Sequence, residues 1–160
     1  MIHEGTNGIQ SLDLLGRKVK TGLSTLVERV AKDIKRASVS GDESLSKRAL
    51  ALDQAMKRLM ETTDKLVGKA SNVTPRLAFA NSHEYLNMAG HTVIAWMWLR
   101  QEIAAAEGLK NASEEWRQFF EGKRFASQYF FQHELPKTVT QSQLLNSLDS
   151  TVVDVKDNYF

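Results

Sequence analysis

The residues best suited to chemistry lie at the start of the chain. Glu4, Gly5, Thr6, Asn7 and Gly8 form a short polar segment, and a long amphipathic pattern begins directly after it. A carboxylate at the start of a helix commonly complements the helix dipole, and residue type alone favours that role. A positioned glutamate can also act as a general base, in which case this segment is one part of a larger site.

A second candidate is the stretch that begins at His83-Glu84 and ends at His91. Zinc proteases of the His-Glu-x-x-His type need two histidines one helical turn apart, but position 87 is asparagine. On a helix, His83 and His91 would be about 12 Å apart along the axis, too far to share one metal ion. The sequence has neither paired Glu-x-x-His motifs nor a glycine-rich phosphate loop. We therefore expect no metal site.

The composition is that of an ordinary globular protein, with 42% apolar and 25% charged residues. The net charge of +2 is too small to indicate a nucleic-acid partner. The absence of cysteine excludes disulfides and thiolate chemistry. The most apolar run, residues 92–99, is far shorter than the roughly 20 residues of a membrane span. The polar start does not resemble a signal peptide, so we expect a cytoplasmic protein without a membrane span.

Apolar residues recur at helical spacing in four long segments. The first segment, 9–37, repeats them in steps of three and four and contains Gly16 and Gly22, which we expect to permit close packing. The second, 43–69, has a wide apolar stripe that predicts more than one neighbour. The third begins at Thr74-Pro75, as an N-cap and a first-turn proline, and ends at about Glu107. Its middle part is apolar nearly all round, which predicts a central position.

The fourth segment opens at Ser113 and ends at Pro136, and the remaining residues, 137–160, predict only a short helix and a tail lying over the bundle. Long helices joined by short turns favour antiparallel neighbours. We therefore predict an all-α fold, an up-down four-helix bundle with a short extra C-terminal helix or tail. The fourth helix should present one apolar side, made of Trp116, Phe119, Phe120, Phe130 and Leu135.

The opening segment, which continues into Ile9-Gln10 and Leu14-Leu15-Gly16-Arg17-Lys18, resembles the end of the catalytic domain of acyl-CoA dehydrogenases. Two later stretches, 85–100 and 120–136, resemble the C-terminal helical extension of the longer members of that family. Some of those members act on methylthiopropionyl-CoA. The opening segment departs from the common family pattern in having His3 where many relatives have tyrosine, and Gly8 where shorter relatives often have glutamine.

The resemblance implies an FAD-dependent oxidation of an acyl-CoA thioester to the 2,3-enoyl-CoA. Glu4 would be the catalytic base that removes the α proton, while the β hydrogen leaves as hydride to the flavin. Gly5 would lie at the substrate, where bulk would crowd the thioester. Thr6, Asn7 and Gly8 would lie against the flavin, where small and polar residues let the backbone approach closely.

The resemblance also implies that this chain is a C-terminal piece of a larger enzyme. Residues 1–37 would end the catalytic domain, and residues 38–160 would form the helical extension. The parent would bind acyl-CoA, transfer electrons to an electron-transfer flavoprotein and form a homo-oligomer. The isolated chain would hold no flavin and would be inactive. The alternative from the residues alone is a free-standing helical bundle that acts as a protein-interaction module, with Glu4 as a helix-start carboxylate.

Overall fold

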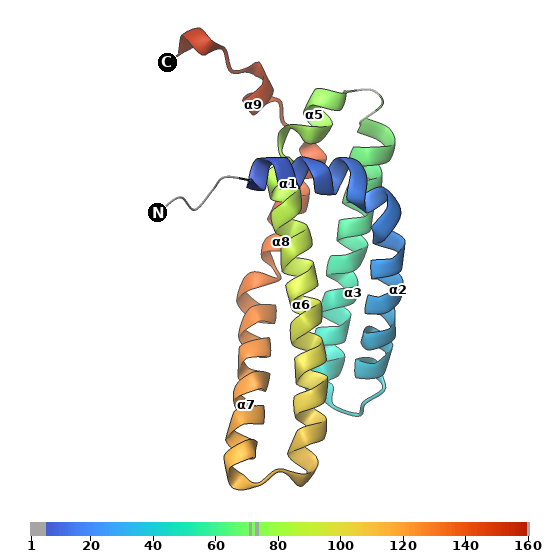
Figure 1. The fold of residues 1–160 in the computed structure, drawn as a ribbon, viewed down its shortest axis with the longest axis vertical. Coiled ribbons are helices and arrows are strands. Elements are labelled where there is room, and N and C mark those ends of the chain that lie inside the picture. Colours follow the sequence, from blue (N-terminus) through green and yellow to red (C-terminus); the bar gives the residue numbers. More distant parts are fainter. Residues whose placement is uncertain (1–5, 71, 73, 160) are drawn as a thin grey trace.

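The computed structural model describes residues 6–70, 72 and 74–159. Throughout these residues the regular structure is helical. Four long helices run alternately down and up (Figure 1): α2 (Val19–Ser38), α3 (Glu43–Thr63), α6 (Ser82–Gly108) and α7 (Glu114–Tyr129). This confirms the predicted all-α up-down bundle. None of the helices among the described residues is long and apolar enough to cross a membrane.

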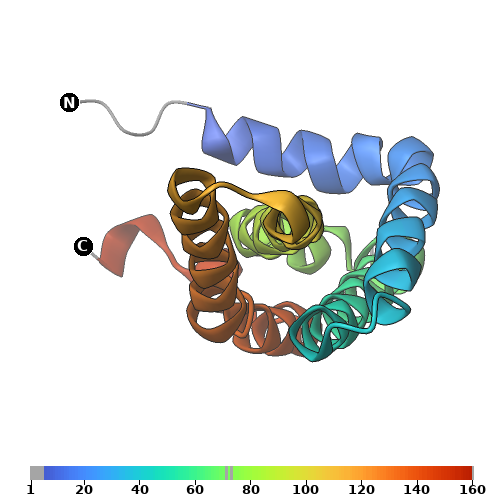
Figure 2. The same ribbon diagram turned by 90° about the horizontal axis from the view of Figure 1, so that it is seen from below.

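Helix α6 occupies the centre of the molecule, as its all-round apolar pattern predicts. Viewed along the bundle, it is surrounded by the other helices, with α1 across one side (Figure 2). Its buried residues include Tyr85, Met88 and Leu99. Trp96 and Trp98 are half-buried on different sides. The indole of Trp96 donates to Asp33 of α2 at 2.7 Å, whereas the ring of Trp98 faces an α7 lysine.

The first predicted helix is not continuous. Helix α1 (Asn7–Asp13) crosses the top of the bundle, and a π-helical turn, η1 (Leu14–Lys18), redirects the chain into α2 (Figure 1). The turn contains Gly16, where a Cβ would lie 3.5 Å from the ring of Phe79. Since 3.5 Å is an ordinary van der Waals distance, the packing of Phe79 at Gly16 does not require a glycine. At Gly22 the expected close packing does not occur, because a Cβ there would meet no atom within 4 Å.

Three further features separate the helices: a glycine turn, an N-cap at Asn81 and a second π-helical turn. Gly41, with a φ of +77°, closes the turn between α2 and α3, because glycine adopts this left-handed conformation readily. The third predicted helix also breaks, at Asn81, into α5 (Pro75–Ala80) and α6. The carbonyl of Asn81 accepts from the backbone N–H of Glu84 at 3.0 Å, so Asn81 occupies an N-cap position in the middle of the predicted segment. A second π-helical turn, η2 (Asp64–Ala70), follows α3.

The fourth predicted helix and the short extra helix are both present. Helix α7 continues through a π-helical turn, η4 (Phe130–Glu134), and ends just before Pro136, close to the predicted position. Pro136 is the N-cap of α8 (Lys137–Ser147), which packs along α3 and α6. Only α9 (Thr151–Asp154) and the short 3₁₀ turn Asp157–Tyr159 form a tail, and Figure 1 shows this tail projecting from the bundle. The predicted short C-terminal helix is α8, and the predicted tail contacts the rest of the molecule at α5 through α9.

The predicted apolar side of α7 was partly wrong. Leu135 is buried, but Trp116 and Phe119 are 55% and 50% exposed. Within α7 the buried position is Ser127, and in η4 it is Phe131, so α7 is rotated relative to the prediction. The exposed rings of Trp116 and Phe119 pack edge to face with centroids 5.6 Å apart. Both contact the ring of Phe120, which lies against Gly108 at the end of α6.

Candidate functional site

The predicted site begins outside the described residues, which include neither Glu4 nor Gly5. The other three predicted site residues form the first turn of α1. Thr6 occupies the N-cap position, and its carbonyl accepts from the backbone N–H of Gln10 at 2.8 Å. The side chain of Gln10 donates to the Thr6 hydroxyl at 3.0 Å.

Helix α1 is held against α6 by a buried polar contact. The hydroxyl of Ser11 donates to the carbonyl of Gly8 at 2.8 Å and lies 2.9 Å from the hydroxyl of Ser82. Four residues further on, Leu15 is fully buried in the core. These contacts fix the first turn of α1 relative to the start of the central helix.

The outer side of the same helix is open. A Cβ at Gly8 would meet no atom within 4 Å, and Thr6 is exposed. Ile9 and Leu12 are 71% and 49% exposed. The backbone at Gly8 is therefore accessible to a large planar molecule, as a flavin-contacting segment requires. These residues fit the edge of a cofactor site, but they provide only a small part of one.

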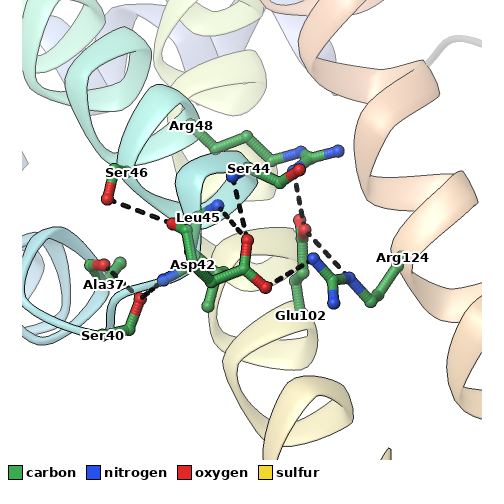
Figure 3. A network of polar contacts seen from close by, with 9 residues as sticks. All are labelled: Ala37, Ser40, Asp42, Ser44, Leu45, Ser46, Arg48, Glu102 and Arg124. Carbon is green, nitrogen blue, oxygen red and sulfur yellow. Dashed lines mark hydrogen bonds and ion pairs between the residues drawn. The ribbon is translucent and has the colours of Figure 1, made fainter.

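A second polar cluster, which we call the Glu102 cluster, lies deep between α3, α6 and α7 (Figure 3). The carboxylate of Glu102 is fully buried and forms an ion pair of 2.7 Å with the guanidinium of Arg48. The guanidinium of Arg124 lies 3.7 Å from Glu102 and 2.6 Å from Asp42. The other oxygen of Asp42 accepts from the backbone N–H groups of Ser44 and Leu45 and caps α3.

Burial is the main influence on the acid–base behaviour of this cluster. It raises the pKa of Glu102 above its usual range, although Ser127 and the two arginines act in the opposite direction. Burial acts in the same direction on Asp42, but the N–H of Leu45, together with Arg124, outweighs it and lowers the pKa of Asp42. Within one cluster, the pKa of Glu102 is therefore raised and the pKa of Asp42 is lowered. Since the side chains of this cluster pair mainly with one another, its evident role is to join three helices.

The sequence analysis missed the Glu102 cluster. Its signal was present, because Glu102 follows the apolar central part of α6 and a buried carboxylate needs a cationic partner. The partner could not be identified, since Arg48 and Arg124 are 54 and 22 residues away along the chain.

The histidines of the rejected zinc motif have ordinary surroundings. The ring of His91 lies 2.8 Å, through Nδ1, from the carbonyl of Asn87 and 3.6 Å, through Nε2, from the carboxylate of Glu134. His83 is exposed. In the part of the chain that the structure describes, no group of three or more acidic or histidine side chains could hold a metal ion.

Comparisons with known proteins identify the relatives of this chain. Residues 26–156 match the family described as acetyl-CoA dehydrogenase C-terminal like. A broad-specificity linear acyl-CoA dehydrogenase of Mycobacterium tuberculosis is 25% identical, and the match covers 99% of this chain and 27% of that protein. A 3-methylmercaptopropionyl-CoA dehydrogenase of Ruegeria pomeroyi is 29% identical, and the match covers 93% of this chain and 26% of that protein. This chain thus spans about a quarter of the length of these relatives. The family match covers most of the bundle, and the chain belongs to the acetyl-CoA dehydrogenase C-terminal-like family.

Proposed function

We propose that this chain is the C-terminal part of an FAD-dependent acyl-CoA dehydrogenase, which oxidises acyl-CoA thioesters to 2,3-enoyl-CoA. The observation that carries the proposal is the family match over residues 26–156, with two acyl-CoA dehydrogenases as relatives. The same match favours the enzyme over a free-standing interaction module. The parent is further proposed to be a cytoplasmic homo-oligomer that transfers electrons to an electron-transfer flavoprotein.

Within this enzyme, we assign residues 1–37 to the end of the catalytic domain and residues 38–160 to the helical extension. Glu4 is the proposed base because it is the carboxylate of the family-like motif, two residues before Thr6, the N-cap of α1. A positioned carboxylate can remove the α proton as a general base. Gly5 beside it leaves room for the thioester.

Thr6, Asn7 and Gly8 are the proposed cofactor contacts. The open space at Gly8 and the exposure of Thr6 suit a backbone against a flat ring. A bound FAD would supply the hydride acceptor, which no side chain of this segment can provide. The task of this chain is then to take the α proton at the carboxylate of Glu4 and to hold one edge of the cofactor site.

The experiment is the Glu4→Gln substitution in the full-length parent. Glutamine keeps the size of the side chain but cannot accept the α proton, and losing a general base typically costs about 10²–10⁴ in rate. We expect a yellow, folded enzyme that binds acyl-CoA and reduces its flavin that much more slowly in stopped-flow absorbance. Glu28→Gln, at an exposed position of α2, is the matched control and should react at the normal rate. Normal flavin reduction in the Glu4→Gln enzyme would show that Glu4 is not the base.

A further inference from the structure

An apolar groove is lined by residues of η1, α2 and α6. Figure 1 shows the bend at which the chain turns from η1 into α2. The volume of the groove is about 410 Å³, and Leu59 of α3 contributes to its lining. The charged residue at the groove, Lys18, has its ammonium 3.1 Å from the carboxylate of Asp13. The walls are apolar: Leu14, Val19 and Leu23 on one side, and Leu86, Ala89 and Val93 on the other.

A glycine lies in each wall of this groove, Gly22 in α2 and Gly90 in α6. A Cβ added at either position would meet no atom within 4 Å. Glycine inside a helix is unfavourable relative to alanine, so its presence calls for a reason. Gly108 has one, because a Cβ there would lie 2.5 Å from the ring of Phe120. Among the described residues, nothing provides such a reason at Gly22 or Gly90.

Apolar side chains on α6 and α1, outside the lining of the groove, are also exposed to water. Ile94, directly after the groove residue Val93, is 47% exposed. Helix α1, which leads into the groove through η1, exposes Ile9 and Leu12. Exposed apolar surface beside an apolar groove is typical of an interaction site. The two glycines would let a backbone or a bulky side chain approach closely.

We propose that the groove between α2 and α6 is a docking site for an apolar segment of the parent polypeptide that precedes this chain. The proposal rests on the proposed function, in which such a segment exists. About three quarters of each relative's length lies outside the matched stretch, so ample chain is present to fill the groove. The chain enters the bundle through α1, and a segment tethered beside the groove has a high effective concentration there.

The test compares full-length parent and 160-residue chain by amide hydrogen exchange. Docking predicts that residues 19–26 and 86–93 exchange about tenfold or more slowly in the parent. Equal exchange of these residues in both proteins would overturn the proposal. The measurement needs no turnover, so it can be made in the Glu4→Gln parent. A parent that oxidises no acyl-CoA but protects the groove would contradict only the proposed function, and an active parent with an unprotected groove would contradict only the docking.

A second test of the docking proposal uses substitutions that fill the groove. Gly90→Leu should cancel the extra protection in the parent, while the 160-residue chain keeps or raises its melting temperature. Gly122→Leu is the matched control, because Gly122 also has open space at its Cβ but is exposed on α7, away from the groove. It should leave groove protection unchanged.

Other occupants give different results, and each would overturn the proposal. If the parent is an oligomer and Gly90→Leu dissociates it in light scattering, a second copy fills the groove. If the 160-residue chain binds the fluorescent fatty acid cis-parinaric acid and Gly90→Leu abolishes that binding, the groove holds an acyl chain.

Discussion

At the scale of single residues, the buried ion pair between Arg48 and Glu102 makes the sharpest prediction. Arg48→Ala leaves a fully buried carboxylate with only the more distant Arg124. Breaking a buried pair by removing one partner typically costs about 3–5 kcal/mol, and we expect a loss of that order in the free energy of unfolding at pH 7. Urea denaturation measures this loss.

The loss should shrink in acid. Because the pKa of Glu102 is raised in the folded state, its stabilising contribution is fully present below the ordinary carboxyl pKa and is lost as pH rises through the folded value. Removing Arg48 raises the folded pKa further, so the deficit of the variant is larger at pH 7 than at pH 5. Arg48→Ala combined with Glu102→Gln is the control and should show little such change with pH. An equal deficit at both pH values in the single variant would mean that Glu102 stays charged without Arg48.

Residue-level prediction from the sequence was possible where a local motif carried the information. Glu4 and its neighbours could be proposed as site residues because five consecutive residues resemble a family motif. Glu102 was not found, because its partners are joined to it only by packing of α3 and α7 against α6. A contact between distant residues leaves no spacing pattern in the chain.

At the scale of helices, the end of α6 depends on one glycine. A Cβ at Gly108 would lie 2.5 Å from the ring of Phe120, so Gly108→Ala forces the ring to move. Overpacking of this kind typically costs about 1–3 kcal/mol, and the helix preference for alanine recovers about 1 kcal/mol at most. We therefore expect a lower melting temperature by calorimetry. Phe120→Leu should relieve the clash when combined with Gly108→Ala.

Gly122→Ala is the comparison for this prediction, since a Cβ there meets no neighbour within 4 Å. It should be neutral or stabilising, because alanine limits the freedom of the unfolded chain. If Gly108→Ala proved as stable as Gly122→Ala, the contact between the end of α6 and α7 would not be tight in solution.

The helices were predictable from apolar spacing, but their bends were not. The central place of α6 follows from its own composition, which is local information. The bend at η1 depends on the Ser11–Ser82 contact and on the approach of Phe79 to Gly16, which join parts of the chain more than 60 residues apart. The rotation of α7, which exposes Trp116, likewise reflects the polar positions Arg124 and Ser127 facing α6.

At the scale of the whole molecule, the bundle has a complete hydrophobic core but contains only a few of the proposed site residues. Its core is continuous from Leu15 of η1 to Leu145 of α8. The proposed site residues, in contrast, are five consecutive residues, of which Thr6, Asn7 and Gly8 form the start of α1. This chain can form its own core. The proposed reaction would also need residues from the part of the parent that corresponds to the unmatched three quarters of the relatives.

The last prediction follows from that separation. The purified 160-residue chain should be colourless, should leave the fluorescence of added FAD unchanged, and should not oxidise acyl-CoA. The proposed contacts at Thr6, Asn7 and Gly8 span a single helical turn, and a dinucleotide must be held along its whole length to offset the cost of immobilising it. Titration of FAD by calorimetry measures this directly. The Glu4→Gln parent provides the comparison, because it should stay yellow while losing only the proton transfer. A yellow 160-residue chain with one flavin per molecule would mean that the bundle itself contains a cofactor site. The proposal that the flavin is held mainly by the rest of the parent would then be wrong.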